Sequence, residues 1–289
     1  MAIKDHIRNP AEWGVDQLRS ANQAVERAGH ALRSPAGEVS LPAVRRIGVA
    51  DLKDVLAKGL SDFAAYRTDV MFLCIIYPVA GLLLASLAFG YDLLPLVAPL
   101  AFGFALIGPV AAVGLYEISR RREQGVDITW ADAFGVTRAP AFGAIVVLGL
   151  VLLVILLLWL AAAQAIYLIT LGHEPPASIG AFVRDVFTTG AGWAMIVLGV
   201  SVGLLFAVLV LTISVVSFPL LLDRDVGLYA AVATSVRAVR MNPGPMAVWG
   251  LIVASSLAIG LLPLLLGLIV VMPVLGHATW HLYRKVVSH

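Results

Sequence analysis

The sequence predicts an all-α protein that crosses a membrane several times, and three observations support this class. Hydrophobic residues make up 60% of the 289 residues and charged residues only 13%, which is far from the composition of a soluble domain. Six apolar spans are each near or above the roughly 20 residues that a helix needs to cross a bilayer. Nineteen of the twenty Lys and Arg residues fall on segments that would lie on one side of these spans.

The six predicted transmembrane helices follow one another as three hairpins. They cover residues 70–89, 94–116, 142–169, 193–221, 245–262 and 264–283. Short loops rich in Lys and Arg stay in the cytoplasm, so both termini are expected inside and Arg184 alone is expected outside. Topology thus explains the positive residues. They form no concentrated patch, and no nucleic acid is expected as a partner.

Two parts of the chain differ in composition. Residues 1–43 are polar and are expected to form a cytoplasmic tail with a weakly amphipathic helix between Pro10 and Ser34. Residues 44–286 form the predicted six-helix transmembrane domain. The first apolar run begins only after about seventy residues of polar chain, so no cleavable signal peptide is expected.

Two short amphipathic segments are predicted to lie in the membrane interface. An apolar stripe at helical spacing precedes the first span. It consists of Leu52, Val55, Leu56, Leu60 and Phe63. In the longest outer loop, 170–192, apolar residues also recur at helical spacing. Helices of this kind normally rest in the headgroup plane rather than crossing the membrane.

The hairpins share a weak internal repeat. A proline, an aromatic residue and an arginine recur at matched spacing near the ends of the first and third hairpins. These residues are Pro109, Tyr116 and Arg120 in the first, and Pro273, Trp280 and Arg284 in the third. Because each unit contains two spans, the copies would keep one orientation in the membrane. The sequence therefore predicts three related hairpins.

Three residues at the inner ends of spans are candidates for a functional cluster. His277 and His281 are spaced i, i+4, so they share one helical face and could both reach a metal or haem iron. Glu117 directly follows the second span and matches His281 in the repeat. An ionisable group near a membrane core is a functional candidate by default. We expect the three side chains around one inner vestibule.

A structural role also explains these residues. Two histidines make an incomplete metal site, and the chain offers only Cys74 as a cysteine and no HExxH or CxxCH motif. Glu117 is spaced to pair with Arg120 or Arg121 on its own helix. The sequence therefore assigns no catalytic residue, no metal and no cofactor, and it favours interfacial anchoring for this cluster.

Four stretches of the chain carry a family resemblance. They are the region 44–123, which begins VRRIGVADLKDVLAKGL, and the motifs SVVSFPLLLDRDVG, ATSVRAVRMNPGPMAVWGLIVA and PVLGHATWHLYRK. Together they resemble the domain of unknown function 2189 family of bacterial membrane proteins, over residues 44–286. The resemblance implies the bacterial inner membrane and a six-helix architecture, and it implies no activity.

Members of this family are often described as cytochrome c oxidase subunit I-like, and that description does not fit this sequence. A haem–copper oxidase core needs a full set of intramembrane histidine ligands for its haems and copper. This chain offers only His277 and His281 as candidates. The resemblance therefore implies location and architecture rather than redox chemistry.

The sequence favours a non-enzymatic role. No charged residue falls in the middle of a span, and no nucleotide or metal motif is present. This favours an accessory, assembly or lipid-organising protein whose partners are the lipid bilayer and other membrane proteins. The alternative is a transporter or channel for a small neutral or hydrophobic solute, favoured by the proline-broken spans and the repeat. A redox protein that uses His277 and His281 is a third hypothesis. The sequence leaves the substrate, the specific partner and the oligomeric state open.

Overall fold

The computed structural model describes residues 41–65, 74–75, 78–79, 81–83, 86, 94–126, 130–139, 141–174, 176–263 and 265–288. Regular structure in this part of the chain is helical, and one isolated antiparallel bridge joins Val44 to Val287. The predicted all-α class is confirmed. The predicted helix within residues 1–43 and most of the predicted span 70–89 lie outside the described residues.

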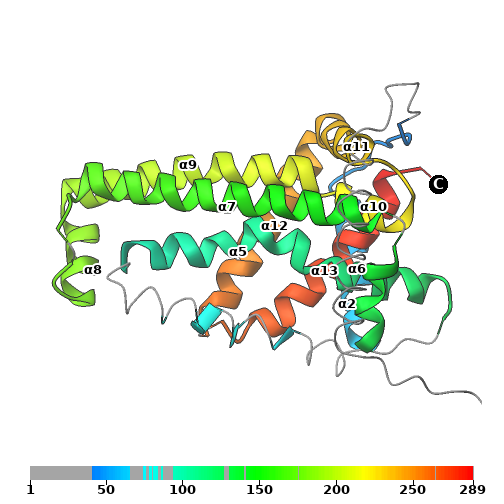
Figure 1. The fold of residues 1–289 in the computed structure, drawn as a ribbon, viewed down its shortest axis with the longest axis horizontal. Coiled ribbons are helices and arrows are strands. Elements are labelled where there is room, and N and C mark those ends of the chain that lie inside the picture. Colours follow the sequence, from blue (N-terminus) through cyan, green and yellow to red (C-terminus); the bar gives the residue numbers. More distant parts are fainter. Residues whose placement is uncertain are drawn as a thin grey trace, which may run out of the picture.

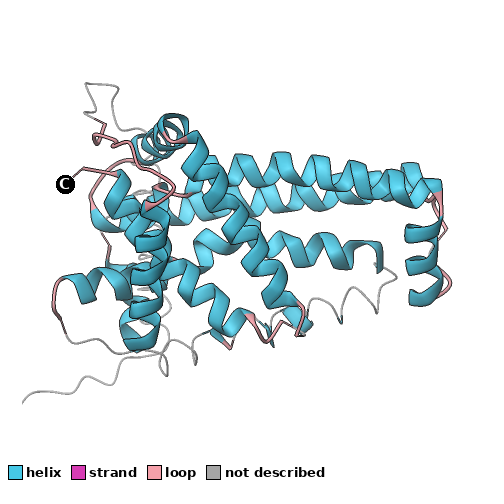
Figure 2. Ribbon diagram, turned by 180° about the vertical axis from the view of Figure 1, so that it is seen from behind, coloured by secondary structure: helices cyan, strands magenta, loops and turns pink. Residues whose placement is uncertain are grey.

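The described helices follow one another from α2 to α13. They are α2 (Asp51–Ala65), η1 (Leu94–Leu96), α5 (Val97–Ala111), α6 (Val113–Glu123), η2 (Trp130–Arg138), α7 (Phe142–Thr170), α8 (Ile179–Thr188), α9 (Gly190–Ser214), α10 (Ser217–Asp223), α11 (Leu228–Met241), α12 (Pro243–Leu261) and α13 (Leu268–Val286). Figure 1 shows α7 and α9 side by side along the long axis, with α8 at one end and α2, α6 and α10 at the other. The view from behind shows α12 and α13 running obliquely to that pair (Figure 2).

Three of these helices are long and apolar enough to cross a membrane: α7, α12, and α9 with its continuation through α10. A fourth candidate is the bent pair Leu94–Gly103 and Ala105–Ala111, whose two parts meet at 43°. Pro109 lies inside this segment and cannot donate the backbone hydrogen bond that a regular helix needs. The described residues thus contain three or four candidate spans, and the prediction of six transmembrane helices is not confirmed.

The predicted sixth span, 264–283, corresponds to α13, which is not among these candidates. Its first half is apolar, but its second half carries His277, His281, Arg284 and Lys285. These side chains lower the mean hydropathy of the helix, and charged ones are costly to place in hydrocarbon.

The helix predicted in the outer loop 170–192 is confirmed as α8. Its first turn is capped by Ser178, whose hydroxyl accepts a hydrogen bond from the backbone N–H of Ala181 at 3.1 Å. Val186 is buried against the molecule, whereas Phe187 is 58% exposed. This helix therefore has the two faces that an interfacial position requires.

The predicted stripe of α2 is confirmed at Leu52, Val55, Leu56 and Phe63, which are buried or packed against the core, and it differs at Leu60. Val55 is buried as expected, but Leu60, which was predicted to belong to the stripe, is 55% exposed. Gly59 and Asp62 complete the buried face, and this face packs on α13. The difference arises because Gly59 lies in close contact with Ala278 of α13, and because the Asp62 side chain finds hydrogen-bond partners on α6 and α13.

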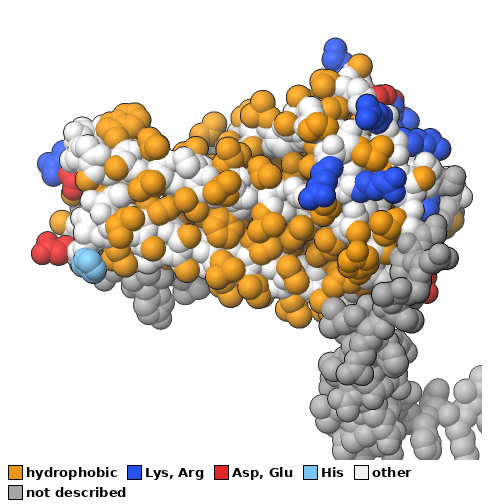
Figure 3. Space-filling model, turned by 90° about the horizontal axis from the view of Figure 1, so that it is seen from above, with side chains coloured by type: hydrophobic (Ala, Val, Ile, Leu, Met, Phe, Trp, Pro, Cys, Tyr) orange, Lys and Arg blue, Asp and Glu red, His pale blue; other side chains and the backbone are white. Residues whose placement is uncertain are grey.

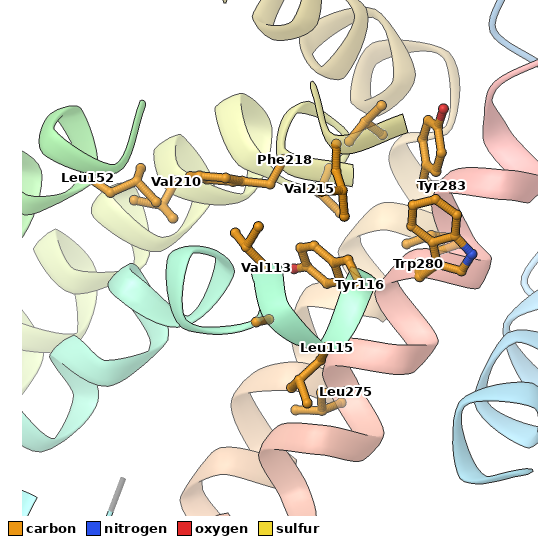
Figure 4. Close-up of a cluster of buried hydrophobic side chains, with 14 of the residues drawn as sticks. Val113, Leu115, Tyr116, Leu152, Val210, Val215, Phe218, Leu275, Trp280 and Tyr283 are labelled. Atoms are coloured by element: carbon orange, nitrogen blue, oxygen red, sulfur yellow. The ribbon is translucent and has the colours of Figure 1, made fainter. Parts of the chain in front are cut away.

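The core lies where α6, α7, α9, α10 and α13 meet. Figure 4 shows apolar side chains from these helices gathered around Phe218, with Leu115 of α6 pointing toward Leu275 of α13. Trp280 and Tyr283 are fully buried, with ring centroids 5.4 Å apart. This packing holds together, at the candidate site, the ends of the helices that lie away from α8.

The described positive side chains gather at one end of the molecule. On the face shown in Figure 3, Lys and Arg lie mainly at the end opposite α8, and hydrophobic side chains cover the middle. The two described chain ends meet at that same end. The N–H of Arg45 donates to the Val286 carbonyl at 2.7 Å, and the N–H of Ser288 donates to the Ala43 carbonyl at 2.9 Å.

Candidate functional site

Two of the three sequence-predicted residues lie on one face of α13. His277 and His281 are one helical turn apart, which corresponds to about 6 Å along the axis. The side chain of His277 is fully buried, and that of His281 is 17% exposed. The spacing brings His277 beside Ser119 of α6 and His281 beside Asp62 of α2.

Asp62 of α2 is the centre of the site, and the sequence analysis did not single it out. Its Oδ2 accepts hydrogen bonds from Nε2 of His281 at 2.9 Å and from the hydroxyl of Ser119 at 2.6 Å. Its Oδ1 accepts from the guanidinium of Arg122 at 2.6 Å. The residue is only 5% exposed. One carboxylate therefore joins α2 to both α6 and α13.

Ser119 connects Asp62 to His277, because its Oγ also lies 2.8 Å from Nδ1 of His277. A hydroxyl has one proton and an ionised carboxylate only accepts, so Ser119 donates to Asp62 and accepts from His277. This assigns the neutral Nδ1–H tautomer to His277. Its Nε2 is buried and has no hydrogen-bond partner within the part of the chain that the structure describes.

The surroundings of Asp62 favour its ionised form. Burial is the largest single effect and raises its pKa, but the hydrogen bonds from His281 and Ser119 and the charges of the two histidines together outweigh it, so that the pKa lies below the ordinary value. The positive charge of Arg122 at 2.6 Å acts in the same direction. The cluster is thus an anion held by donors from two other helices.

The N-terminal end of α2 is fixed by further contacts. Nζ of Lys285 lies 2.9 Å from Oδ1 of Asp51 and 3.0 Å from Oδ2 of Asp54. Just before the helix, the N–H of Ile47 donates to Oδ1 of the buried Asn242 at 2.8 Å. These contacts with Asn242, at the end of α11, and with Lys285 of α13 hold α2 in the position that places Asp62 at the site.

Glu117 belongs to a separate network on α6. Its Oε2 accepts from Nε of Arg120 at 2.8 Å, and its Oε1 accepts from Nε of Arg121 at 2.7 Å, so both of the predicted pairs form. Arg121 also donates to Asp132 of η2. Among the described residues, no hydrogen bond links Glu117 to either histidine. Glu117 and the two histidines therefore take part in two different hydrogen-bond networks.

A polar pocket of about 220 Å³ opens beside Glu117. Its charged lining consists of Arg120, Arg121, Arg224, Glu117, Asp223 and Asp225. The three arginines and three carboxylates balance in formal charge, and Arg224 also donates to the Ser288 carbonyl at 2.7 Å. This pocket therefore offers no excess charge to an ionic ligand.

A larger chamber lies between α5, α6, α9, α12 and α13. Its volume is about 450 Å³, within the range of small-molecule sites. Its described lining is almost entirely apolar and includes no Lys, Arg, His, Asp or Glu. The sequence analysis did not predict this chamber, because its existence depends on how helices far apart in the chain pack.

The side chains around Asp62 do not form a metal centre. Within the described residues, no group of three or more His, Cys, Asp or Glu residues is arranged to hold a metal ion. The neighbours that complete the Asp62 site are a hydroxyl and a guanidinium, which serve as hydrogen-bond donors to the carboxylate. The geometry is that of a hydrogen-bonded link between helices.

Comparison with known proteins finds one family model that is similar to part of this chain. A family model described as "Predicted integral membrane protein (DUF2189)" matches residues 96–223. No curated protein and no solved structure matches the chain. The matched segment contains Glu117, Ser119 and Arg122 but neither α2 nor α13. Residues 96–223 of this chain are therefore similar to the domain of unknown function 2189 family of predicted integral membrane proteins, which is the family that the sequence motifs resemble.

Proposed function

We propose that this protein is a non-enzymatic accessory, assembly or lipid-organising protein of a bacterial inner membrane. It would cross that membrane six times with both termini in the cytoplasm, and it would present a rigid inner platform to other membrane proteins. The platform consists of α2, α6 and the C-terminal half of α13.

The observation that carries this proposal is the complete engagement of the Asp62 carboxylate. Both of its oxygens accept hydrogen bonds, from Ser119, His281 and Arg122 on two other helices. An acid or base that takes part in chemistry must be able to reach a substrate within hydrogen-bond distance. Here the ionisable groups reach one another, and the result of their pairing is that α2 is fixed on α6 and α13.

The arrangement of charge supports the proposed topology. Residues 43–45 pair with residues 286–288 at the end of the molecule where the described Lys and Arg gather. Arg184 lies on α8 at the opposite end of the α7–α9 pair. Positive residues in short loops favour the cytoplasmic side. This distribution supports an inner position for the platform.

The proposal is tested by purifying the full chain from its native membrane in mild detergent, through a tag at Met1, and identifying what is recovered with it. We expect a partner membrane protein in stoichiometric amount. Asp62→Asn, which removes the charge that holds α2, should lose this partner when recovery is compared at equal amounts of purified protein. The matched control is Asp185→Asn on α8, because the side chain of Asp185 is 47% exposed and pairs with its chain neighbour Arg184 rather than with α2, α6 or α13, and this variant should retain the partner.

Recovery of the wild-type protein alone, without a stoichiometric partner, would count against the accessory role. Equal recovery of the partner with wild-type protein and with Asp62→Asn would show that the α2 platform is not the docking surface.

Transport of a small neutral or hydrophobic solute is the second candidate, and one observation favours it. The chamber of about 450 Å³ lies between three of the candidate spans, α5, α9 and α12, and α5 is bent by 43° where it lines the chamber. Uptake of a fluorescent neutral solute by liposomes that contain the purified protein tests this function. A rate equal to that of protein-free liposomes would exclude it for that solute.

A further inference from the structure

We infer that the apolar chamber is a binding site for a neutral membrane lipid whose head group is a hydroxyl, such as a long-chain alcohol. This site is distinct from the Asp62 network. The inference does not depend on the accessory role, because the two are tested by different measurements.

The rim of the chamber is the first part of the argument. Leu204 and Val208 of α9 and Leu251 of α12 line the chamber, and they are 62%, 51% and 67% exposed. Both helices are candidate membrane spans. An opening whose rim is formed by exposed apolar residues of two spans faces hydrocarbon rather than water. The occupant therefore enters from the bilayer and has a long apolar part.

The length of the chamber is the second part. It extends along α9 from Leu204 to Val215, which corresponds to about 16 Å at 1.5 Å per residue. The opposite wall includes Leu257 of α12 and Met272 of α13. A space of this length, apolar on both sides, fits an extended acyl or alkyl chain.

The end of the chamber that is lined by Tyr116, Ser214 and Thr279, called its inner end here, determines the head group. The hydroxyl of Thr279, which lines the chamber together with Tyr116, donates to the Leu275 carbonyl at 2.7 Å. The hydroxyl of Ser214 donates to the Val210 carbonyl at 2.6 Å. The oxygens of Tyr116 and Ser214 keep lone pairs that can still accept. The lining thus offers acceptors and calls for a ligand that donates.

The uncharged lining excludes charged head groups, including charged hydrogen-bond donors. No charged residue is among the described lining, so an ammonium, carboxylate or phosphate head would be buried without a partner of opposite charge. A hydroxyl donates a hydrogen bond without carrying charge. A neutral lipid alcohol therefore matches both the wall and the inner end of the chamber.

Photolabelling of the purified full-length protein tests the inference. The probes are an analogue of hexadecanol with a diazirine on its alkyl chain, and the matching analogue of palmitic acid. We expect the alcohol to label peptides of α9 and α12 at least several-fold more than the acid, with excess unmodified hexadecanol competing. Labelling that is equal for the two head groups, or that is confined to other helices, would overturn the inference.

A variant that fills the chamber provides the second arm. Gly108 lines the chamber, and a Cβ added there would meet no heavy atom within 4 Å. Gly108→Leu should reduce labelling by the alcohol probe at least several-fold. The matched control is Gly199→Leu, because Gly199 is not among the lining residues and a Cβ there also meets nothing within 4 Å. Unchanged labelling of a folded Gly108→Leu protein would refute the site.

Two further variants keep the test decisive. If Gly108→Leu lowers the melting temperature, Ala254→Leu fills the chamber from α12 instead, with the same expectation. Tyr116→Phe removes the phenolic oxygen and should reduce the preference for the alcohol over a diazirine-bearing alkane, while labelling by the alkane stays unchanged. An unchanged preference would exclude Tyr116 as the group that receives the ligand hydroxyl.

Discussion

Gly59 of α2 lies so close to Ala278 of α13 that a Cβ added to residue 59 would stand 2.6 Å from the Ala278 Cβ. Real side chains do not approach this closely, so only glycine allows the two helices to pack at this distance. Asp62 follows Gly59 on the same face of α2. The close approach therefore sets the distance from which the Asp62 carboxylate reaches Ser119 and His281.

Replacement of Gly59 by alanine should separate α2 from α13. We expect a loss of about 1–3 kcal/mol of stability, the usual cost of adding a methyl group to a packed contact, measured by thermal unfolding in detergent. Gly180→Ala on the exposed α8 is the control, because a Cβ there meets nothing within 4 Å. Equal melting temperatures for the two variants would contradict this account.

Asp62→Asn should destabilise the protein more than Asp54→Asn. We expect about 2–3 kcal/mol for Asp62, below the usual cost for a fully buried pair because the Arg122 side chain is 33% exposed. For the exposed Asp54, which pairs with Lys58 at 3.2 Å and with Lys285 at 3.0 Å, we expect a smaller loss, because water screens both pairs. Chemical unfolding of both variants provides the comparison, and a larger loss for Asp54 would refute the central position of Asp62.

The lowered pKa of Asp62 predicts a pH dependence. A carboxyl group with a lower pKa in the folded than in the unfolded state stabilises the protein above the unfolded value of about 3.9. This stabilisation is lost as the pH falls through the folded-state pKa. Below about pH 4, the melting temperature of the wild type should therefore fall more steeply than that of Asp62→Asn. Parallel curves for the two proteins would show that Asp62 does not carry the effect.

The two histidines should differ in their contributions to stability. His277→Ala removes a fully buried ring and leaves a cavity, so we expect a loss of about 2 kcal/mol or more. His281→Ala removes one hydrogen bond from a partly exposed ring, so we expect about 1 kcal/mol. If both variants and the double variant match the wild type in stability, abundance and partner recovery, the histidines have no role in this site.

Reporter fusions test the topology. Fusions after residues 91, 180 and 263 should report a periplasmic position, and fusions after residues 130, 230 and 289 a cytoplasmic one, because the positive residues gather at the latter end. Residue 180 is the most informative, since it lies in α8 at the opposite end of the molecule. A cytoplasmic signal there would overturn the predicted orientation.

Local features of the fold could be predicted because they depend on residues close together in the chain. The apolar runs of α7, α9 and α12, the helix α8 in the loop 170–192, and the pairing of Glu117 with Arg120 and Arg121 each follow from composition or helical spacing. The i, i+4 spacing also placed His277 and His281 on one face. The six-span count remains a prediction, since most of the span 70–89 lies outside the described residues.

The sequence by itself thus determined the all-α membrane class, the ends at which charge gathers, and which histidines share a helical face. Only the tertiary structure decided that His281 is hydrogen-bonded to Asp62 and that Ser119 connects His277 to the same carboxylate. The helical spacing already placed Gly59 and Asp62 on the same face as Val55. The role of a charged residue on an apolar stripe, however, cannot be assigned until its partners are known. Ser119 and His281 lie 57 and 219 residues away from Asp62 along the chain. The apolar chamber has the same origin: helix packing between distant segments creates it, and no local pattern encodes it.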